Sequence, residues 1–88
     1  MNEPRDHRIK RLKMRSMRRG IKEMDLILQR FAEANLDAMD DAGLDLYDAM
    51  LSENDHDLYQ WVSGQTEVPD VYVDLMGRII AQLPEAHA

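Results

Sequence analysis

The sequence predicts an all-α fold, a compact single-domain bundle of five helices. Apolar residues recur at steps of three and four along five segments, which is the spacing of a helix face. The 88 residues include four glycines and three prolines but seven methionines, a composition that favours helix over strand. No segment shows the apolar–polar alternation of a half-buried strand. A chain of this length makes one domain with a thin core.

The first predicted helix covers residues 8–19 and is strongly basic. Its apolar stripe is narrow and consists of Ile9, Leu12 and Ser16. We expect the helix to stop at Gly20, because glycine adopts the left-handed conformation that closes many helices. Residues 1–7 precede it and are expected to be flexible.

The second predicted helix runs over residues 21–35. Its apolar face is Ile21, Met24, Leu28 and Phe31. A third helix follows with Asp40 as its N-cap, and Met39 and Leu44 stand at the two positions of a hydrophobic staple.

The fourth helix is short, over residues 56–63, with Asp55 as its cap and Gly64 as its stop. The fifth follows Pro69, has the most regular apolar face of the chain and ends at Pro84. The predicted domain is therefore 8–83, with residues 84–88 as a flexible tail. The core is expected to include one or two side chains from each of the last four helices: Leu28, Phe31, Tyr47, Trp61, Leu75 and Ile79.

Charge divides the chain in two. Residues 1–30 hold ten of the eleven Lys and Arg, for a net charge of +6, and residues 31–88 carry −12. A basic segment of this kind can meet nucleic acid, an anionic cofactor or an acidic protein surface. No aromatic residue lies among the basic ones for stacking on bases, so specific nucleic-acid binding is not expected.

The sequence lacks the residue patterns of catalytic and metal-binding sites. The chain has no cysteine, and its three histidines stand apart from one another, so neither a metal site nor a catalytic residue is predicted. No apolar run is long enough for a membrane span. The aspartates around the third helix lack the pattern of a calcium loop and are interpreted as a solvated face: Asp37, Asp40, Asp41, Asp45 and Asp48.

One short motif is informative. Arg19, Gly20 and Glu23 form an Arg-Gly-x-x-Glu pattern between a basic helix and an apolar one. A second landmark, Asp-x-Asp-Leu-(aromatic)-x-Trp, begins at Asp55 and ends at Trp61. With both landmarks the sequence resembles the succinate dehydrogenase assembly factor 2 family of flavinylation factors, over about residues 11–83.

The resemblance implies a protein that is not an enzyme. Such factors bind the flavoprotein subunit of succinate dehydrogenase, and in some bacteria that of fumarate reductase, and promote covalent attachment of FAD to a histidine of that subunit. No tightly bound cofactor is expected, since the FAD is attached in the partner. The family's motif places the partner contacts on Arg19, Gly20 and Glu23, with Arg18 and Asp25 flanking them.

Two alternatives remain open: a nucleic-acid-binding protein acting through the basic first helix, and an antitoxin-like regulator of another protein. We expect a monomer. The short, Ser-poor N-terminus lacks the features of a transit segment, which favours a bacterial, cytoplasmic form.

Overall fold

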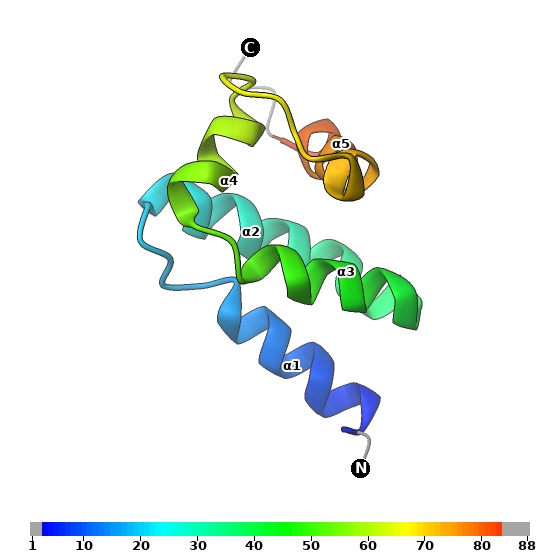
Figure 1. Cartoon of the computed structure of the whole chain (residues 1–88). Coiled ribbons are helices and arrows are strands. Elements are labelled where there is room, and N and C mark those ends of the chain that lie inside the picture. Colours follow the sequence, from blue (N-terminus) through cyan, green and yellow to red (C-terminus); the bar gives the residue numbers. More distant parts are fainter. Residues whose placement is uncertain (1–2, 84–88) are drawn as a thin grey trace.

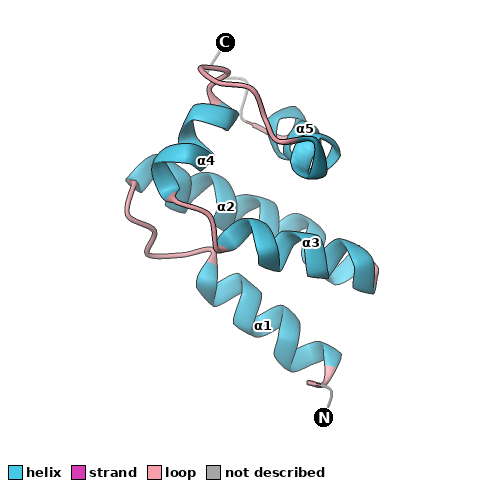
Figure 2. Ribbon diagram, in the orientation of Figure 1, coloured by secondary structure: helices cyan, strands magenta, loops and turns pink. Residues whose placement is uncertain are grey.

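The computed structural model describes residues 3–83. Within this range the chain folds into five α-helices and two short 3-10 turns, with no strand (Figures 1 and 2). The helices are α1 (Arg5–Arg15), α2 (Lys22–Asn35), α3 (Asp41–Leu51), α4 (Asp55–Val62) and α5 (Val73–Ala81). The prediction of an all-α protein with five helices is confirmed. The predicted tail, residues 84–88, lies outside the described residues.

α2 is the central helix. It packs against α1 on one side and against α4 and α5 on the other, while α1 also runs along α3 (Figure 1). The core extends through the whole bundle as one cluster, to which every helix contributes. All six predicted core residues are buried in it: Leu28, Phe31, Tyr47, Trp61, Leu75 and Ile79.

α1 begins and ends earlier than the sequence predicts. It starts at Arg5, so part of the segment expected to be flexible is helical, and it ends at Arg15. Ser16 follows, fully buried, with its hydroxyl bonded to the Leu12 carbonyl at 2.8 Å and to the Tyr47 hydroxyl at 2.6 Å. The left-handed residue after the helix is Arg18, with φ of 57°, and not Gly20. The prediction that Gly20 stops this helix is therefore wrong.

The buried hydroxyl of Tyr47 should make the folded protein less stable at alkaline pH. Burial raises the pKa of Tyr47 to about 12, from 10.0 in an exposed tyrosine. The folded protein keeps this proton at a pH where the unfolded chain has lost it. The stabilisation is therefore complete below about pH 10 and is lost as the pH rises toward 12.

We expect the free energy of unfolding of Tyr47→Phe to fall less steeply than that of the native protein above about pH 10. Urea denaturation at a series of pH values checks this. Part of the slope should remain, because burial also raises the pKa of Tyr72. Equal slopes for the two proteins would contradict this assignment.

The side chains that cap the helices differ in part from those predicted. Asp40 caps α3 as predicted, and its carboxylate accepts from the Gly43 amide at 2.8 Å. Gly64, with φ of 79°, ends α4 as predicted. The N-cap of α4, however, is Asn54, whose side chain accepts from the His56 amide at 2.8 Å. The prediction of Asp55 as this cap is wrong, and its carboxylate is left for another contact.

Candidate functional site

The five predicted site residues lie at one corner of the molecule. Arg18, Arg19 and Gly20 belong to the α1–α2 loop, residues 16–21, and Glu23 and Asp25 follow in the first turn of α2. Arg18, Gly20 and Glu23 are exposed, and Asp25 is half-buried. The predicted helix over residues 8–19 would have placed Arg18 and Arg19 in its last turn, but both follow the end of α1 at Arg15.

Arg19 is turned inward. Its side chain is only 12% exposed, and its Nε donates to Asp55 Oδ1 at 2.8 Å while Nη2 lies 2.8 Å from the same oxygen. The guanidinium also donates to the carbonyl oxygens of Arg15 and Leu51, both at 3.0 Å. One side chain thus ties the α1–α2 loop to the ends of α1 and α3 and to the start of α4.

Gly20 lies against the same carboxylate. Its amide donates to Asp55 Oδ2 at 2.5 Å. A Cβ at position 20 would stand 2.9 Å from that oxygen, closer than real Cβ contacts come. Glycine is therefore favoured here by a close approach and not by its φ angle, since a Cβ would force the carboxylate or the loop to shift.

Asp55 is the residue of this site that sequence reasoning missed. The sequence assigned it to capping α4, although Asn54 beside it is an equally good capping residue. With Asn54 as the cap, both oxygens of Asp55 serve the α1–α2 loop. The signal was present, since Asp55 opens the second landmark and Arg19 the first.

Most of the Lys and Arg residues of α1 are paired with acids of the same molecule. Arg8 contacts Asp45 of α3, and Arg15 contacts Asp48. Further ion pairs of the N-terminal segment are Arg5–Asp41, Arg11–Asp48 and Lys13–Asp37. Four of the five aspartates interpreted as a solvated face are therefore ion-pair partners, and Asp40 is a cap.

This pairing predicts weak binding to nucleic acid. An arginine that already contacts a carboxylate releases fewer counterions when it meets a phosphate. We expect duplex DNA or RNA to bind only at low salt and to dissociate near about 150 mM salt. Fluorescence anisotropy across a salt series checks this. Sequence-selective binding at physiological salt would contradict it and favour the nucleic-acid alternative.

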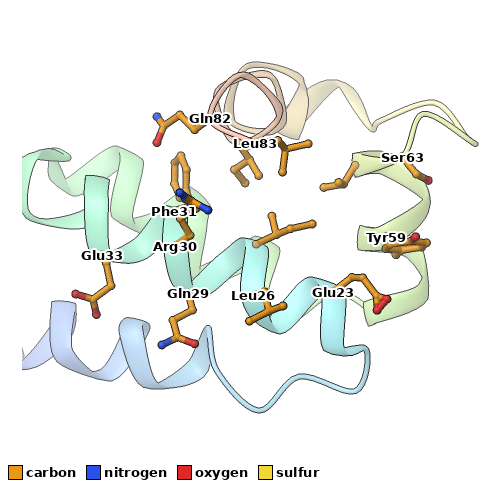
Figure 3. Close-up of a pocket in the computed structure, with 13 residues that line it drawn as sticks. Glu23, Leu26, Gln29, Arg30, Phe31, Glu33, Tyr59, Ser63, Gln82 and Leu83 are labelled. Atoms are coloured by element: carbon orange, nitrogen blue, oxygen red, sulfur yellow. The ribbon is translucent and has the colours of Figure 1, made fainter. Parts of the chain in front are cut away.

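A groove of about 790 Å³ begins beside Glu23 and lies between α2, α4 and α5 (Figure 3). Its lining is largely apolar and includes the edge of Phe31. Glu23 and Tyr59 stand at one end of the groove. At the other end Gln82 exchanges two hydrogen bonds with Asn35, of 2.6 and 3.0 Å. Glu23 therefore belongs both to the loop corner and to the rim of the groove.

Residues 3–83 hold neither a candidate metal site nor a membrane-spanning helix. In this range no three Asp, Glu or His side chains gather where they could hold a metal ion. Nor does any helix described here have the length and apolar character needed to cross a bilayer.

The chain is similar to a known family over most of its length. The family model described as flavinator of succinate dehydrogenase matches residues 10–84. A protein of Meyerozyma guilliermondii named succinate dehydrogenase assembly factor 2, mitochondrial, is 43% identical over 75 residues, 82% of this chain and 56% of that protein. The protein of the same name from Schizosaccharomyces pombe is 43% identical over 68 residues, 77% of this chain and 49% of that protein.

A third protein of this name, from Komagataella phaffii, is 39% identical over 90 residues, 99% of this chain and 46% of that protein. The chain thus spans about half the length of the curated relatives it matches. These relatives are all named mitochondrial proteins. The prediction of a bacterial, cytoplasmic protein is contradicted by that finding.

Proposed function

This chain belongs to the succinate dehydrogenase flavinator family, and we propose that it binds the flavoprotein subunit of succinate dehydrogenase and promotes covalent attachment of FAD to that subunit. The support is the family match over residues 10–84 together with the relatives named as assembly factors of this enzyme. The observation that carries the proposal is the anchored corner, where the Arg-Gly-x-x-Glu motif is held by three helices.

The contact surface in this proposal is the exposed part of that corner. Arg18 and Glu23 offer a guanidinium and a carboxylate that no ion pair occupies within residues 3–83, with Gly20 between them and Asp25 beside them. Arg19 shapes this surface from inside, since its donors are directed at Asp55 and two carbonyl oxygens. A charged, rigid surface of this kind suits recognition of a folded partner.

The factor supplies no catalytic side chain in this mechanism. The flavoprotein makes the bond between FAD and its own histidine, and the factor holds the subunit in a conformation where the two groups are in reacting geometry. Holding reactants in a near-attack arrangement can lower a barrier by several kcal/mol. Binding to the flavoprotein is therefore sufficient for the effect.

The test in cells compares covalent flavin in the flavoprotein subunit with and without this chain. After denaturing electrophoresis, flavin fluorescence in the subunit's band should be strong only when the chain is present. The same comparison on the flavoprotein of fumarate reductase determines whether that subunit is a second partner. Equal fluorescence in the succinate dehydrogenase subunit with and without the chain would refute the proposed function.

Replacing Glu23 with alanine separates partner contact from stability. The Glu23 side chain makes no hydrogen bond or ion pair among the described residues, so its electrostatic role in stability is limited to the helix dipole, at most about 1 kcal/mol. If it contacts the flavoprotein, Glu23→Ala should lower the flavinylation rate at least about tenfold while the melting temperature changes little.

Glu33→Ala is the matched control for this variant. Glu33 is an exposed glutamate on the same helix, ten residues further along, and should leave the flavinylation rate unchanged. A folded Glu23→Ala protein with the native rate would remove Glu23 from the contact surface.

A further inference from the structure

We propose that Asp55 is a positioning residue: it fixes the conformation of the α1–α2 loop through Arg19 and Gly20, and so presents Arg18 and Glu23 to the partner. This inference deepens the proposed function and rests on it for its effect on flavinylation. The positioning itself is a property of the chain alone and can be measured without the partner.

Both oxygens of the Asp55 carboxylate are used by the loop. Oδ1 accepts from Arg19 Nε and lies 2.8 Å from Nη2, and Oδ2 accepts from the Gly20 amide at 2.5 Å. The side chain is 20% exposed, so water screens these contacts only in part. A carboxylate that receives a guanidinium and a backbone amide together fixes the direction of the chain between them.

The helix that carries Asp55 does not need this carboxylate as its cap. Asn54 is the N-cap of α4 and satisfies the His56 amide. At the first position of the helix, Asp55 still gains from the helix dipole, a small benefit that any acid in this turn would have. Its particular geometry therefore serves the loop and not α4.

The loop has few other anchors. Within the described part of the chain, residues 18–20 make no backbone-to-backbone hydrogen bond. Arg18 also stands in the left-handed region, with φ of 57°, which is unfavourable for a residue with a Cβ. A strained conformation of this kind persists only where neighbouring contacts impose it. Here those contacts are the bonds of Arg19 and Gly20. Both residues donate to Asp55, and Arg19 also donates to the carbonyl oxygens of Arg15 and Leu51.

A substitution at Gly20 tests this inference directly, because a side chain added there would contact Asp55. Among the described residues, and leaving aside the two chain neighbours of Gly20, only Asp55 has atoms within 4 Å of a Cβ built at position 20. Alanine at position 20 should therefore displace the loop when Asp55 is present. When Asp55 is shortened to alanine, the added methyl group meets nothing and should have no further effect.

The experiment compares the native protein with Gly20→Ala, Asp55→Ala and the double variant in a reaction of apo-flavoprotein and FAD. We expect each single change to lower the flavinylation rate about tenfold, and the double variant to match Asp55→Ala alone, as for two residues that act on one another. If Gly20 instead allows a close approach of the partner's backbone, the two substitutions act independently. The double variant should then lower the flavinylation rate about a hundredfold. That result, or a native rate in Asp55→Ala, would overturn the inference.

A second measurement keeps the test independent of misfolding and of the proposed function. Hydrogen exchange of the Gly20 amide, followed by NMR, should be slow in the native protein, fast in Asp55→Ala and intermediate in Asp55→Asn, which keeps one acceptor oxygen. Asp74→Ala, which removes an exposed first-turn aspartate of α5, should leave the exchange slow.

These readouts distinguish the two possible failures. If the native chain does not promote flavinylation but the Gly20 amide loses its protection in Asp55→Ala, the proposed function fails and the positioning by Asp55 stands. If the exchange of this amide is the same with and without Asp55, the positioning is refuted whatever the flavin assay gives.

Discussion

Trp61→Ala should lower the free energy of unfolding by about 3–5 kcal/mol, the range found when a buried tryptophan is cut back to alanine. The side chain is 8% exposed, and its ring lies 5.8 Å from that of Tyr72, tilted by 34°. It joins α4 to the segment that leads into α5. In a thin core, the cavity left by this ring cannot be filled by its neighbours without moving a helix. Urea denaturation measures the loss.

Tyr59→Ala is the control for this substitution. Tyr59 lies on the same helix and is an aromatic residue of similar size, but it is only half-buried and packs against the outside of the core. Tyr59→Ala should therefore lower the free energy of unfolding by less than Trp61→Ala does. An unchanged urea midpoint for Trp61→Ala would show that the core does not depend on this residue.

Arg19→Ala should lower the free energy of unfolding by about 2–3 kcal/mol, typical for hydrogen bonds to charged groups that are mostly shielded from water. The substitution leaves the Asp55 carboxylate without its guanidinium and removes the donors to the Arg15 and Leu51 carbonyl oxygens. Arg19→Lys should recover little of this, because one ammonium group cannot reach three acceptors in different directions. Thermal and urea melts measure both variants.

Arg18→Ala is the matched control, since it removes the neighbouring arginine. Arg18 is exposed and makes no ion pair among residues 3–83, so its loss should change stability by at most about 0.5 kcal/mol. Equal effects of the two arginine substitutions would contradict the structural role given to Arg19.

The helices and the core could be predicted from the sequence because they depend on the local spacing of apolar residues. The apolar stripes of α2 and α5 predicted Leu28, Phe31, Leu75 and Ile79 as core, and all four are buried. Asp40 was recognisable as a cap because its contact with the Gly43 amide lies within one helical turn. Such features need no knowledge of what lies across the bundle.

The end of α1 could not be predicted from the sequence, since residues far along the chain determine it. Ser16 is held by the hydroxyl of Tyr47, 31 positions later, and the loop after it is held by Asp55. The sequence assigned the break to Gly20 from glycine's freedom at positive φ. The structure uses the small size of Gly20 instead and places the positive φ at Arg18.

The division of charge was visible, but its meaning depended on the fold. A count along the chain shows a basic segment and an acidic remainder, which suggested a partner for the basic residues. The fold supplies that partner, since aspartates of α3 pair with arginines of α1 at a similar spacing: Arg5 with Asp41, Arg8 with Asp45, and Arg11 with Asp48. An exposed cation next to the motif is Arg18, and the charge count alone could not single it out.

The proposed function is tested most directly by mixing the purified apo-flavoprotein subunit, FAD and this chain, and following covalent flavin by in-gel fluorescence over time. We predict that the chain raises the rate of attachment in a saturable way, and that Glu23→Ala loses this effect while its thermal melt stays close to that of the native protein. The same rate of attachment with and without the chain would contradict the proposal.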